Sequence, residues 1–137
     1  MIRVLIVDDH ELIRLGLEAV LAAEPDFELC GNAPDGAAGV TMARSTCPDV
    51  VVMDVNMPYM DGVSATGAIL RDCPTTKVVV LSWSADDSSV SRALDAGASA
   101  YLVKETDWTD VVAAIRSVHQ GERPPTCVAF NEFAGSA

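Results

Sequence analysis

The sequence predicts an α/β fold built on a parallel β-sheet of five strands. Five short apolar runs recur along the chain, and each is followed by a stretch in which apolar residues have helical spacing. Such alternation is typical of a doubly wound sheet with helices on both faces. The chain has 137 residues, which is enough for one compact domain with a sizeable core and too few for two ordinary domains.

The apolar runs differ in pattern, and the pattern indicates the place of each strand. Three of them are continuously apolar, as expected of central strands buried on both faces. The second run alternates with polar residues and the fifth ends abruptly at Lys104, so we expect these two strands at the edges of the sheet. The five predicted strands are residues 2–7, 27–30, 50–53, 78–81 and 100–103.

The stretches between the strands predict the helices. From Ile13 onward, apolar residues at i, i+4, i+7 and i+8 form one face of a helix that ends before Pro25. Similar stripes predict helices around residues 90–97 and 111–118, with Gly121 as the C-cap of the last one. Shorter helices are expected over residues 36–44 and 63–71.

The composition changes after Gly121. Pro124 and Pro125 cannot extend a helix, so we expect residues 1–121 to form the folded domain and residues 122–137 to be a linker or a frayed C-terminal tail.

The charge of the chain excludes some classes of partner. Lys and Arg number 9 and Asp and Glu number 20, which gives a net charge of −11. Such a field repels a phosphate backbone, so we do not expect this domain to bind nucleic acid directly. No apolar run approaches the roughly 20 residues of a membrane span, and the N-terminus is unlike a secretory signal. Because the chain shows neither a membrane span nor a secretory signal, we expect a cytoplasmic protein. The four cysteines show no metal-binding spacing.

Polar residues follow the predicted strands at their carboxyl ends. Asp8 and Asp9 follow the first strand, Asp54 the third, Ser82 the fourth and Lys104 the fifth. In open parallel sheets, ligands bind at the carboxyl ends of the strands, where the strand order reverses. If the first and third strands are neighbours, three carboxylates meet at this edge.

Three close carboxylates require a compensating cation, because like charges raise one another's pKa. Hard oxygen ligands on separate loops favour Mg²⁺, and Mn²⁺ could substitute for it. With this metal, Asp54 could attack phosphorus as a nucleophile. Lys104 would neutralise the phosphoryl oxygens and Ser82 would donate a hydrogen bond to one of them. The product would be an acyl phosphate whose charge could move the surrounding loops.

These residues resemble the receiver domain of bacterial two-component response regulators. The matching stretches are residues 7–10, 54–62, 80–82 and 97–104, and the likeness covers residues 1–121. The resemblance implies a flavodoxin-like (βα)5 fold with strand order 2-1-3-4-5. It also implies that a partner sensor histidine kinase donates the phosphoryl group, and that the domain promotes its own phosphorylation and dephosphorylation rather than acting as an enzyme on other substrates.

The resemblance also implies a role for each residue of the site. It gives Asp54 as the phosphoacceptor, and a metal site completed by a direct ligand, a mostly water-mediated ligand and a backbone carbonyl. It further gives two switch residues and a phosphate-pairing lysine. The direct metal ligand is Asp9, the mostly water-mediated ligand is Asp8 and the backbone carbonyl is that of Asn56. The switch residues are Ser82 and Tyr101, and the phosphate-pairing lysine is Lys104.

Two details resemble the subgroup with a helix-turn-helix DNA-binding output domain, the NarL/FixJ/LuxR type. These are Asp-Asp-His at residues 8–10, and Lys104-Glu105 where many receivers have Lys-Pro. The output domain is absent from this chain. The resemblance leaves open a phosphorylation-dependent homodimer formed through the last helix.

Two other classes of protein remain as alternatives. A Mg²⁺-dependent phosphatase with an aspartyl nucleophile needs Asp-x-Asp, but Asn56 stands at the second position. A flavodoxin-like cofactor binder needs an anion-binding loop after the first strand, where Asp8 and Asp9 would repel phosphate. A separate hypothesis concerns Trp83, whose bulk beside Ser82 would restrict access of small phosphodonors such as acetyl phosphate.

Overall fold

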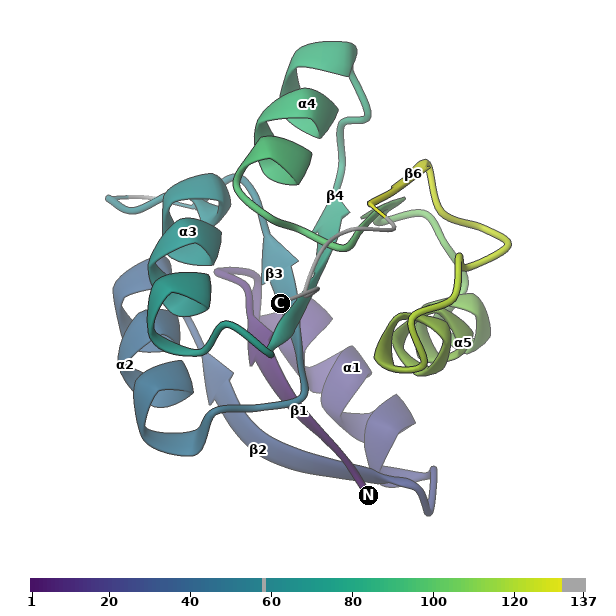
Figure 1. The fold of residues 1–137 in the computed structure, drawn as a ribbon. Helices are drawn as coiled ribbons and strands as arrows, with labels where there is room; N and C mark the ends of the chain where they lie inside the picture. The colour runs from purple at the N-terminus through teal and green to yellow at the C-terminus, as the bar shows by residue number, and fades with distance from the viewer. Residues whose placement is uncertain (58, 132–137) are drawn as a thin grey trace.

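Strands and helices alternate along residues 1–57 and 59–131, the part of the chain that the computed structural model describes (Figure 1). The strands are β1 (Ile2–Val7), β2 (Phe27–Ala33), β3 (Val50–Asp54), β4 (Lys77–Ser82), β5 (Ala100–Val103) and β6 (Ala129–Phe130). The helices are α1 (Glu11–Ala22), α2 (Gly36–Thr46), α3 (Gly62–Asp72), α4 (Asp87–Asp95) and α5 (Trp108–His119).

The sheet confirms the predicted fold and strand order. Its strands run in the order β2-β1-β3-β4-β5-β6, and the first five of these pair in parallel. As predicted, β1, β3 and β4 are central and β2 lies at an edge. The second strand continues to Ala33, beyond the predicted end at residue 30, with an irregular register opposite Val4 and Leu5.

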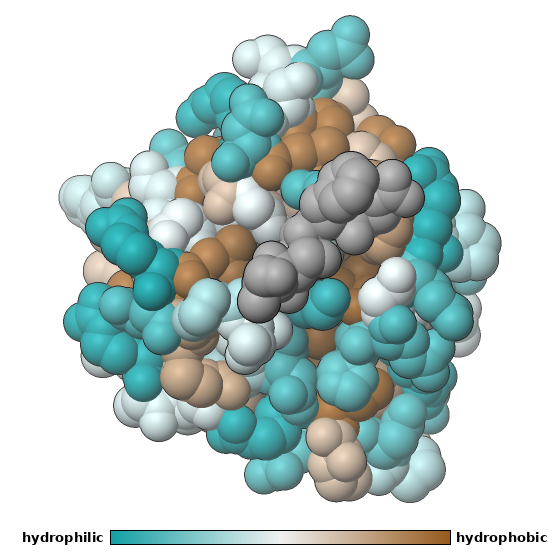
Figure 2. All heavy atoms as spheres, in the orientation of Figure 1, coloured by the Kyte–Doolittle hydropathy of each residue, from teal (hydrophilic) through white to brown (hydrophobic). Residues whose placement is uncertain are grey.

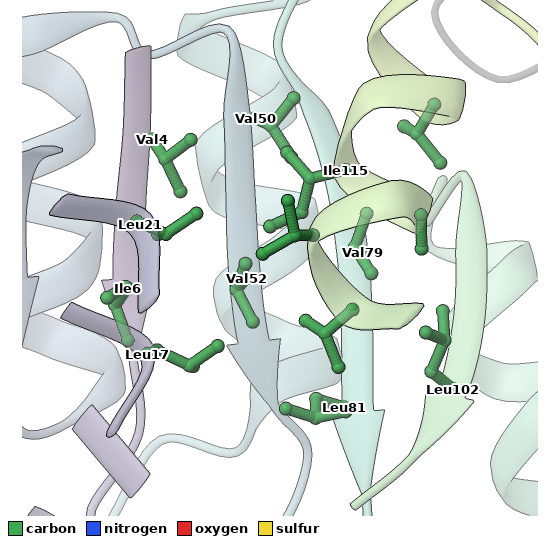
Figure 3. Packing of buried hydrophobic residues seen from close by; sticks show 14 of the residues in the cluster. Val4, Ile6, Leu17, Leu21, Val50, Val52, Val79, Leu81, Leu102 and Ile115 are labelled. Atoms are coloured by element: carbon green, nitrogen blue, oxygen red, sulfur yellow. The ribbon is translucent and has the colours of Figure 1, made fainter. Parts of the chain in front are cut away.

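Two hydrophobic layers hold the helices against the sheet. Val4 and Ile6 of β1 face the layer formed with α1 and α5, whereas Leu5 and Val7 face the layer formed with α2, α3 and α4. Figure 3 shows the first layer, where Ile115 of α5 lies over the strands. Burying an aliphatic side chain of this size stabilises the fold by about 1.5–3 kcal/mol. Because successive residues of each strand face opposite sides of the sheet, helices pack stably on both faces.

Aspartates fix the start of three helices. The side chains of Asp35, Asp61 and Asp86 accept hydrogen bonds from backbone N–H groups at the beginnings of α2, α3 and α4. An N-cap of this kind typically stabilises a helix by about 1 kcal/mol. At the other end of the domain Gly121 has φ +79° after α5, which agrees with its predicted place at the end of this helix.

The segment after α5 differs from the expected frayed tail. Val128 N–H donates to the carbonyl of Tyr101 at 2.7 Å, and Asn131 N–H donates to that of Ser99 at 2.8 Å. Ala129–Phe130 thereby forms an antiparallel strand beside β5. The prediction that residues 100–103 form an edge strand was wrong, because this short segment, too brief to give a strand pattern, satisfies the open backbone groups of β5.

The surface on one side of the molecule is mainly polar. Figure 2 shows that hydrophilic residues cover most of this face, with hydrophobic ones visible mainly toward its centre. Within the described residues, none of the helices has the length and apolar character needed to traverse a bilayer. The four cysteines carry free thiols, and Cys47 is exposed rather than part of the core.

Candidate functional site

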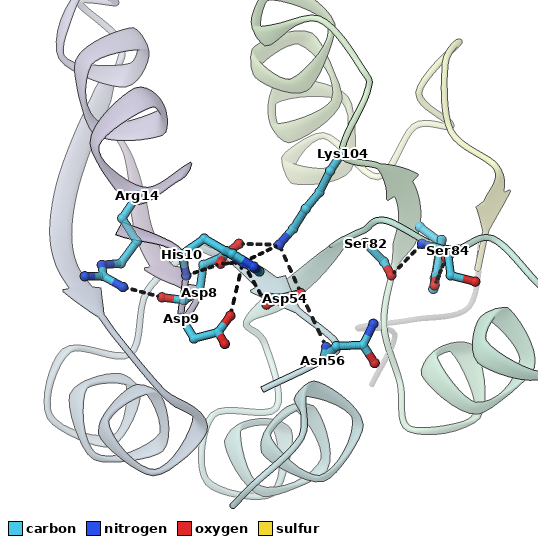
Figure 4. Close-up of polar contacts among 10 residues, drawn as sticks. Asp8, Asp9, His10, Arg14, Asp54, Asn56, Ser82, Ser84 and Lys104 are labelled. Carbon is cyan, nitrogen blue, oxygen red and sulfur yellow. Dashed lines mark hydrogen bonds and ion pairs between the residues drawn. The ribbon is translucent and has the colours of Figure 1, made fainter. Parts of the chain in front are cut away.

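The strand ends bring the predicted site residues together at one edge of the sheet (Figure 4). Asp8 follows β1, Asp54 ends β3, Ser82 ends β4 and Lys104 follows β5. All four are buried, with exposed fractions of 2%, 2%, 1% and 7%. The parallel pairing of β1 with β3 aligns Val7 with Met53, so the aspartates that come next lie side by side.

Lys104 pairs with both buried aspartates. Its Nζ lies 3.0 Å from Asp8 Oδ2 and 3.2 Å from Asp54 Oδ1. The backbone N–H of Lys104 donates to the carbonyl of Ser82 at 2.8 Å, which fixes the end of β5 against β4. One ammonium group cannot balance two buried carboxylates, and Asp9 adds a third at the same edge.

Asp54 is the most perturbed carboxyl group of the site. Burial raises the pKa of Asp54, the charge of Asp8 raises it further, and Lys104 opposes both, so that it lies at about 7. Its Oδ2 atom is buried and has no hydrogen-bond partner among the described residues. A buried carboxylate oxygen without a partner is costly, so this position lacks one positive group.

The arrangement fits a divalent cation. One ligand atom from each of Asp8, Asp9, His10 and Asp54 lies within 4.8 Å of the others. The three carboxylates supply hard oxygen ligands of the kind that Mg²⁺ prefers, and a cation there would give Asp54 Oδ2 the partner that it lacks.

His10 is a functional candidate to which the sequence analysis gave no role in the site. It directly precedes the first residue of α1, and its ring turns into the acidic cluster. Nδ1 lies 2.9 Å from Asp8 Oδ1 and 3.1 Å from Asp9 Oδ1. The position of His10 directly after Asp9 could have indicated this, because the same strand-end argument applies to it. Arg14 was also missed; its Nη1 donates to the carbonyl of Asp8 at 2.6 Å.

The loop after Asp54 folds closely back on the end of β3. The backbone N–H of Asn56 donates to Asp54 Oδ1 at 3.3 Å, and Gly62 N–H donates to the carbonyl of Val55 at 2.8 Å. A Cβ on Gly62 would lie only 2.0 Å from the carbonyl oxygen of Asp54, so only glycine fits there. The role of the Asn56 carbonyl as a metal ligand stays a prediction.

The two expected switch residues are connected through Ser84. Ser82 Oγ accepts a hydrogen bond from Ser84 N–H at 3.2 Å, and the hydroxyl of the fully buried Tyr101 donates to the Ser84 carbonyl. Ser84 Oγ in turn donates to Asp86 Oδ1 at 2.6 Å, at the start of α4. This chain of contacts runs from the end of β4 to both β5 and α4.

Trp83 lies beside the lysine of the site. Lys104 Nζ is 5.5 Å from the centre of the indole ring, a separation at which a cation and an aromatic face attract each other. The indole is half-exposed, so it lies between Lys104 and solvent. Residue 58, which the sequence analysis grouped with the loop after Asp54, lies outside the described residues.

The fold and the strand-end site define a class of protein, and comparison with known proteins identifies it. Residues 4–116 match the response regulator receiver domain family, and the chain belongs to this family.

Similar proteins agree with the predicted subgroup. The transcriptional regulatory protein LiaR of Bacillus subtilis is 45% identical over 122 residues, covering 89% of this chain and 58% of the relative. DegU of Brevibacillus brevis is 42% identical over 120 residues, covering 88% of this chain and 51% of the relative. The chain therefore spans little more than half the length of these curated relatives.

Solved structures confirm the receiver fold of the NarL/LuxR type. The signal receiver domain of the putative response regulator NarL from Mycobacterium tuberculosis has a TM-score of 0.83 at 33% identity, covering 88% of this chain and 98% of that one. A LuxR-family two-component response regulator from Aurantimonas has a TM-score of 0.83 at 30% identity, covering 90% and 89%.

Proposed function

We propose that this receiver domain accepts a phosphoryl group on Asp54 from a phosphohistidine of a partner sensor kinase, in a reaction that requires Mg²⁺ or Mn²⁺. The observation that carries the proposal is the buried Asp54 carboxylate beside two further aspartates. One of its oxygens contacts Lys104, and the other has no hydrogen-bond partner among the described residues.

The chemistry follows from the groups at the strand ends. A carboxylate oxygen of Asp54 attacks phosphorus, a P–O bond forms, and the P–N bond of the phosphohistidine breaks with its electron pair returning to the imidazole. Lys104 already lies 3.2 Å from Asp54, where its ammonium can neutralise a phosphoryl oxygen. When bound by Asp8, Asp9, Asp54 and the Asn56 carbonyl, the metal supplies further positive charge for the phosphoryl oxygens.

Phosphorylation acts through the contacts of Ser84. The phosphoryl group gives Ser82 Oγ–H a strong acceptor, which draws Ser82 away from Ser84 N–H. Because Ser84 also contacts Tyr101 and Asp86, its displacement changes the packing around β5 and the start of α4. We infer that this surface reports phosphorylation to an output domain.

The output and partners extend the proposal beyond this chain. The relatives are named as transcriptional regulators, and we propose that a DNA-binding domain outside this chain controls transcription in the cytoplasm. A homodimer formed on phosphorylation is part of this proposal, and it can be measured by sedimentation with and without the phosphodonor. The phosphatase alternative lacks an observation in its favour, because Asn56 is exposed and supplies no carboxyl group for acid/base catalysis.

The test is phosphotransfer from a candidate sensor kinase in the presence of MgCl₂. Wild type is expected to take up one phosphoryl group that is stable in acid and labile in base, and chelation by EDTA is expected to prevent it. Asp54→Asn keeps the size of the side chain but removes the nucleophile, and should remain unlabelled. Equal labelling of Asp54→Asn and wild type would refute Asp54 as the acceptor.

A further inference from the structure

The two buried carboxylates divide their oxygens between two neighbours. Asp8 Oδ2 and Asp54 Oδ1 contact Lys104 Nζ at 3.0 and 3.2 Å. The other oxygen of each faces His10, whose Nδ1 lies 2.9 Å from Asp8 Oδ1 and 3.8 Å from Asp54 Oδ2. Asp9 Oδ1 adds a third contact at 3.1 Å. The imidazole nitrogen is therefore surrounded by three carboxylate oxygens (Figure 4).

Neither neutral form of the His10 ring satisfies this surrounding. If Nδ1 carries the hydrogen, it donates to Asp8, but it then has no lone pair for Lys104 Nζ, which lies 3.2 Å away. If Nδ1 is unprotonated, it accepts from Lys104 but turns its lone pair toward the oxygens of Asp8 and Asp9. A cation bound by unprotonated Nδ1 and by the carboxylate oxygens removes the conflict with Asp8 and Asp9, because each of these atoms then gives an electron pair to the ion. Lys104 Nζ keeps Asp8 Oδ2 and Asp54 Oδ1 as its acceptors.

The separations match those of ligands around one metal ion. For bonds of about 2.1 Å, adjacent ligands of an octahedral ion lie about 3.0 Å apart. The contacts of His10 Nδ1 with Asp8 and Asp9, at 2.9 and 3.1 Å, have this spacing. The buried Asp54 Oδ2, which has no hydrogen-bond partner among the described residues, borders the same space.

We propose that His10 Nδ1 is a ligand of this metal site and shifts its preference from Mg²⁺ toward late first-row divalent ions such as Ni²⁺ and Zn²⁺, with Mn²⁺ also bound. The inference rests on the metal site of the proposed function. Imidazole is a favourable ligand for these ions, whereas Mg²⁺ prefers oxygen ligands throughout. Lys104 stays on Asp8 Oδ2 and Asp54 Oδ1, and the ion lies between His10 Nδ1 and the other oxygens of these aspartates.

Calorimetric titration with MgCl₂ and with NiCl₂ tests the preference. His10→Ala is expected to weaken Ni²⁺ binding relative to Mg²⁺ binding by about tenfold or more, since loss of even an outer-sphere partner of a ligand costs 10–100-fold in affinity. His10→Asn provides an oxygen donor and suits a helix start, so it should retain Mg²⁺ and lose the Ni²⁺ preference. The matched control is His119→Ala, which removes the exposed imidazole at the end of α5 and should change neither affinity.

A spectroscopic measurement tests ligation directly, without relying on a change in affinity. In the protein loaded with Mn²⁺, pulsed electron paramagnetic resonance should show ¹⁴N coupling from a bound imidazole in wild type and in His119→Ala, and none in His10→Ala. Mn²⁺ binding without ¹⁴N coupling in wild type would overturn this inference and leave phosphotransfer to Asp54 intact. Failure of wild type to bind any divalent ion would overturn it together with the metal requirement of the proposed function.

Discussion

Two clusters of charged residues in this domain differ in what they leave unsatisfied. On the surface, Arg116 of α5 contacts Asp26 at 2.8 Å and Glu24 at 3.0 Å, and its guanidinium lies 5.0 Å from the centre of the Phe27 ring. At the sheet edge, Lys104 shares one ammonium among buried carboxylates. The first cluster joins α5 to the segment before β2, and there one guanidinium pairs with two exposed carboxylates. In the second, one ammonium group faces the buried carboxylates of Asp8 and Asp54, with Asp9 beside them.

The pKa values express the same difference. Hydrogen bonds from Arg116 lower the pKa of Asp26, and those carboxylates raise the pKa of Arg116. Burial instead raises the pKa of Asp54 to about 7. Folding therefore favours the ionised form of the surface carboxylate and disfavours that of the buried one. A cation that binds beside the ionised Asp54 therefore relieves an unfavourable buried charge. In the absence of such a cation, this buried charge lowers the free energy of unfolding of the domain at neutral pH.

The largest expected effect is that of Lys104→Met. This change leaves Asp8 and Asp54 buried without their ammonium partner, and breaking a buried pair in this way typically costs about 3–5 kcal/mol. Urea unfolding at pH 7.5 in EDTA should show this loss. Arg116→Met is the control and should cost much less, with a loss that shrinks further in 0.5 M NaCl, because exposed pairs are screened. Equal losses from the two variants would contradict the comparison.

The next effect is the pH dependence that Asp54 imposes. The folded-state pKa, at about 7, lies above the unfolded value of 3.8, so the folded state holds the proton more tightly. The free energy of unfolding of the metal-free protein should therefore fall as pH rises from 3.8 to about 7, by about 4 kcal/mol at most, at 1.36 kcal/mol for each unit. In urea titrations across this window, Asp54→Asn should lose this slope and be more stable than wild type at pH 7.5. A slope that is unchanged in Asp54→Asn would place its origin elsewhere.

A smaller effect is expected when a divalent ion completes the buried cluster. An ion present at ten times its dissociation constant stabilises the folded state by about 1.4 kcal/mol. MgCl₂ should raise the Tm of wild type and of Arg116→Ala equally, and should raise that of Asp9→Asn less. A thermal scan with and without EDTA measures this, and an equal rise in Asp9→Asn would exclude Asp9 as a ligand.

Trp83→Ala is expected to change the stability of the domain least. Its expected effect is a faster phosphorylation of Asp54 by acetyl phosphate. The half-exposed indole lies beside Lys104, so its removal should speed phosphorylation of Asp54 by acetyl phosphate while leaving the free energy of unfolding nearly unchanged. Rates measured at equal MgCl₂ for wild type and Trp83→Ala decide this. Unchanged rates would show that the indole does not shield the site.

The sequence predicted the parts of the molecule that depend on periodicity and on strand ends. Continuous apolar runs placed β1, β3 and β4 in the centre, and polar residues after them placed Asp8, Asp54, Ser82 and Lys104 at one edge. The prediction did not extend to β6, because two residues carry no period and their pairing depends on the long-range approach of residue 128 to β5.

The part of the site that sequence reasoning missed depends on side-chain direction. A histidine after two aspartates can point to solvent or toward the acidic cluster, and its side-chain rotamer together with the backbone at the start of α1 determines which. The contact of Tyr101 with Ser84 likewise joins residues 17 positions apart. Such contacts follow from packing between elements, which no local pattern contains.

The strand formed by Ala129–Phe130 has a consequence for recognition. By pairing with Ala100 and Tyr101, this segment occupies the backbone groups through which a partner could otherwise extend the sheet. A protein that would extend the sheet by pairing directly with β5 must therefore first displace this segment. The return of the chain along β5 thus keeps the backbone groups of Ala100 and Tyr101 from pairing with a strand of a second copy.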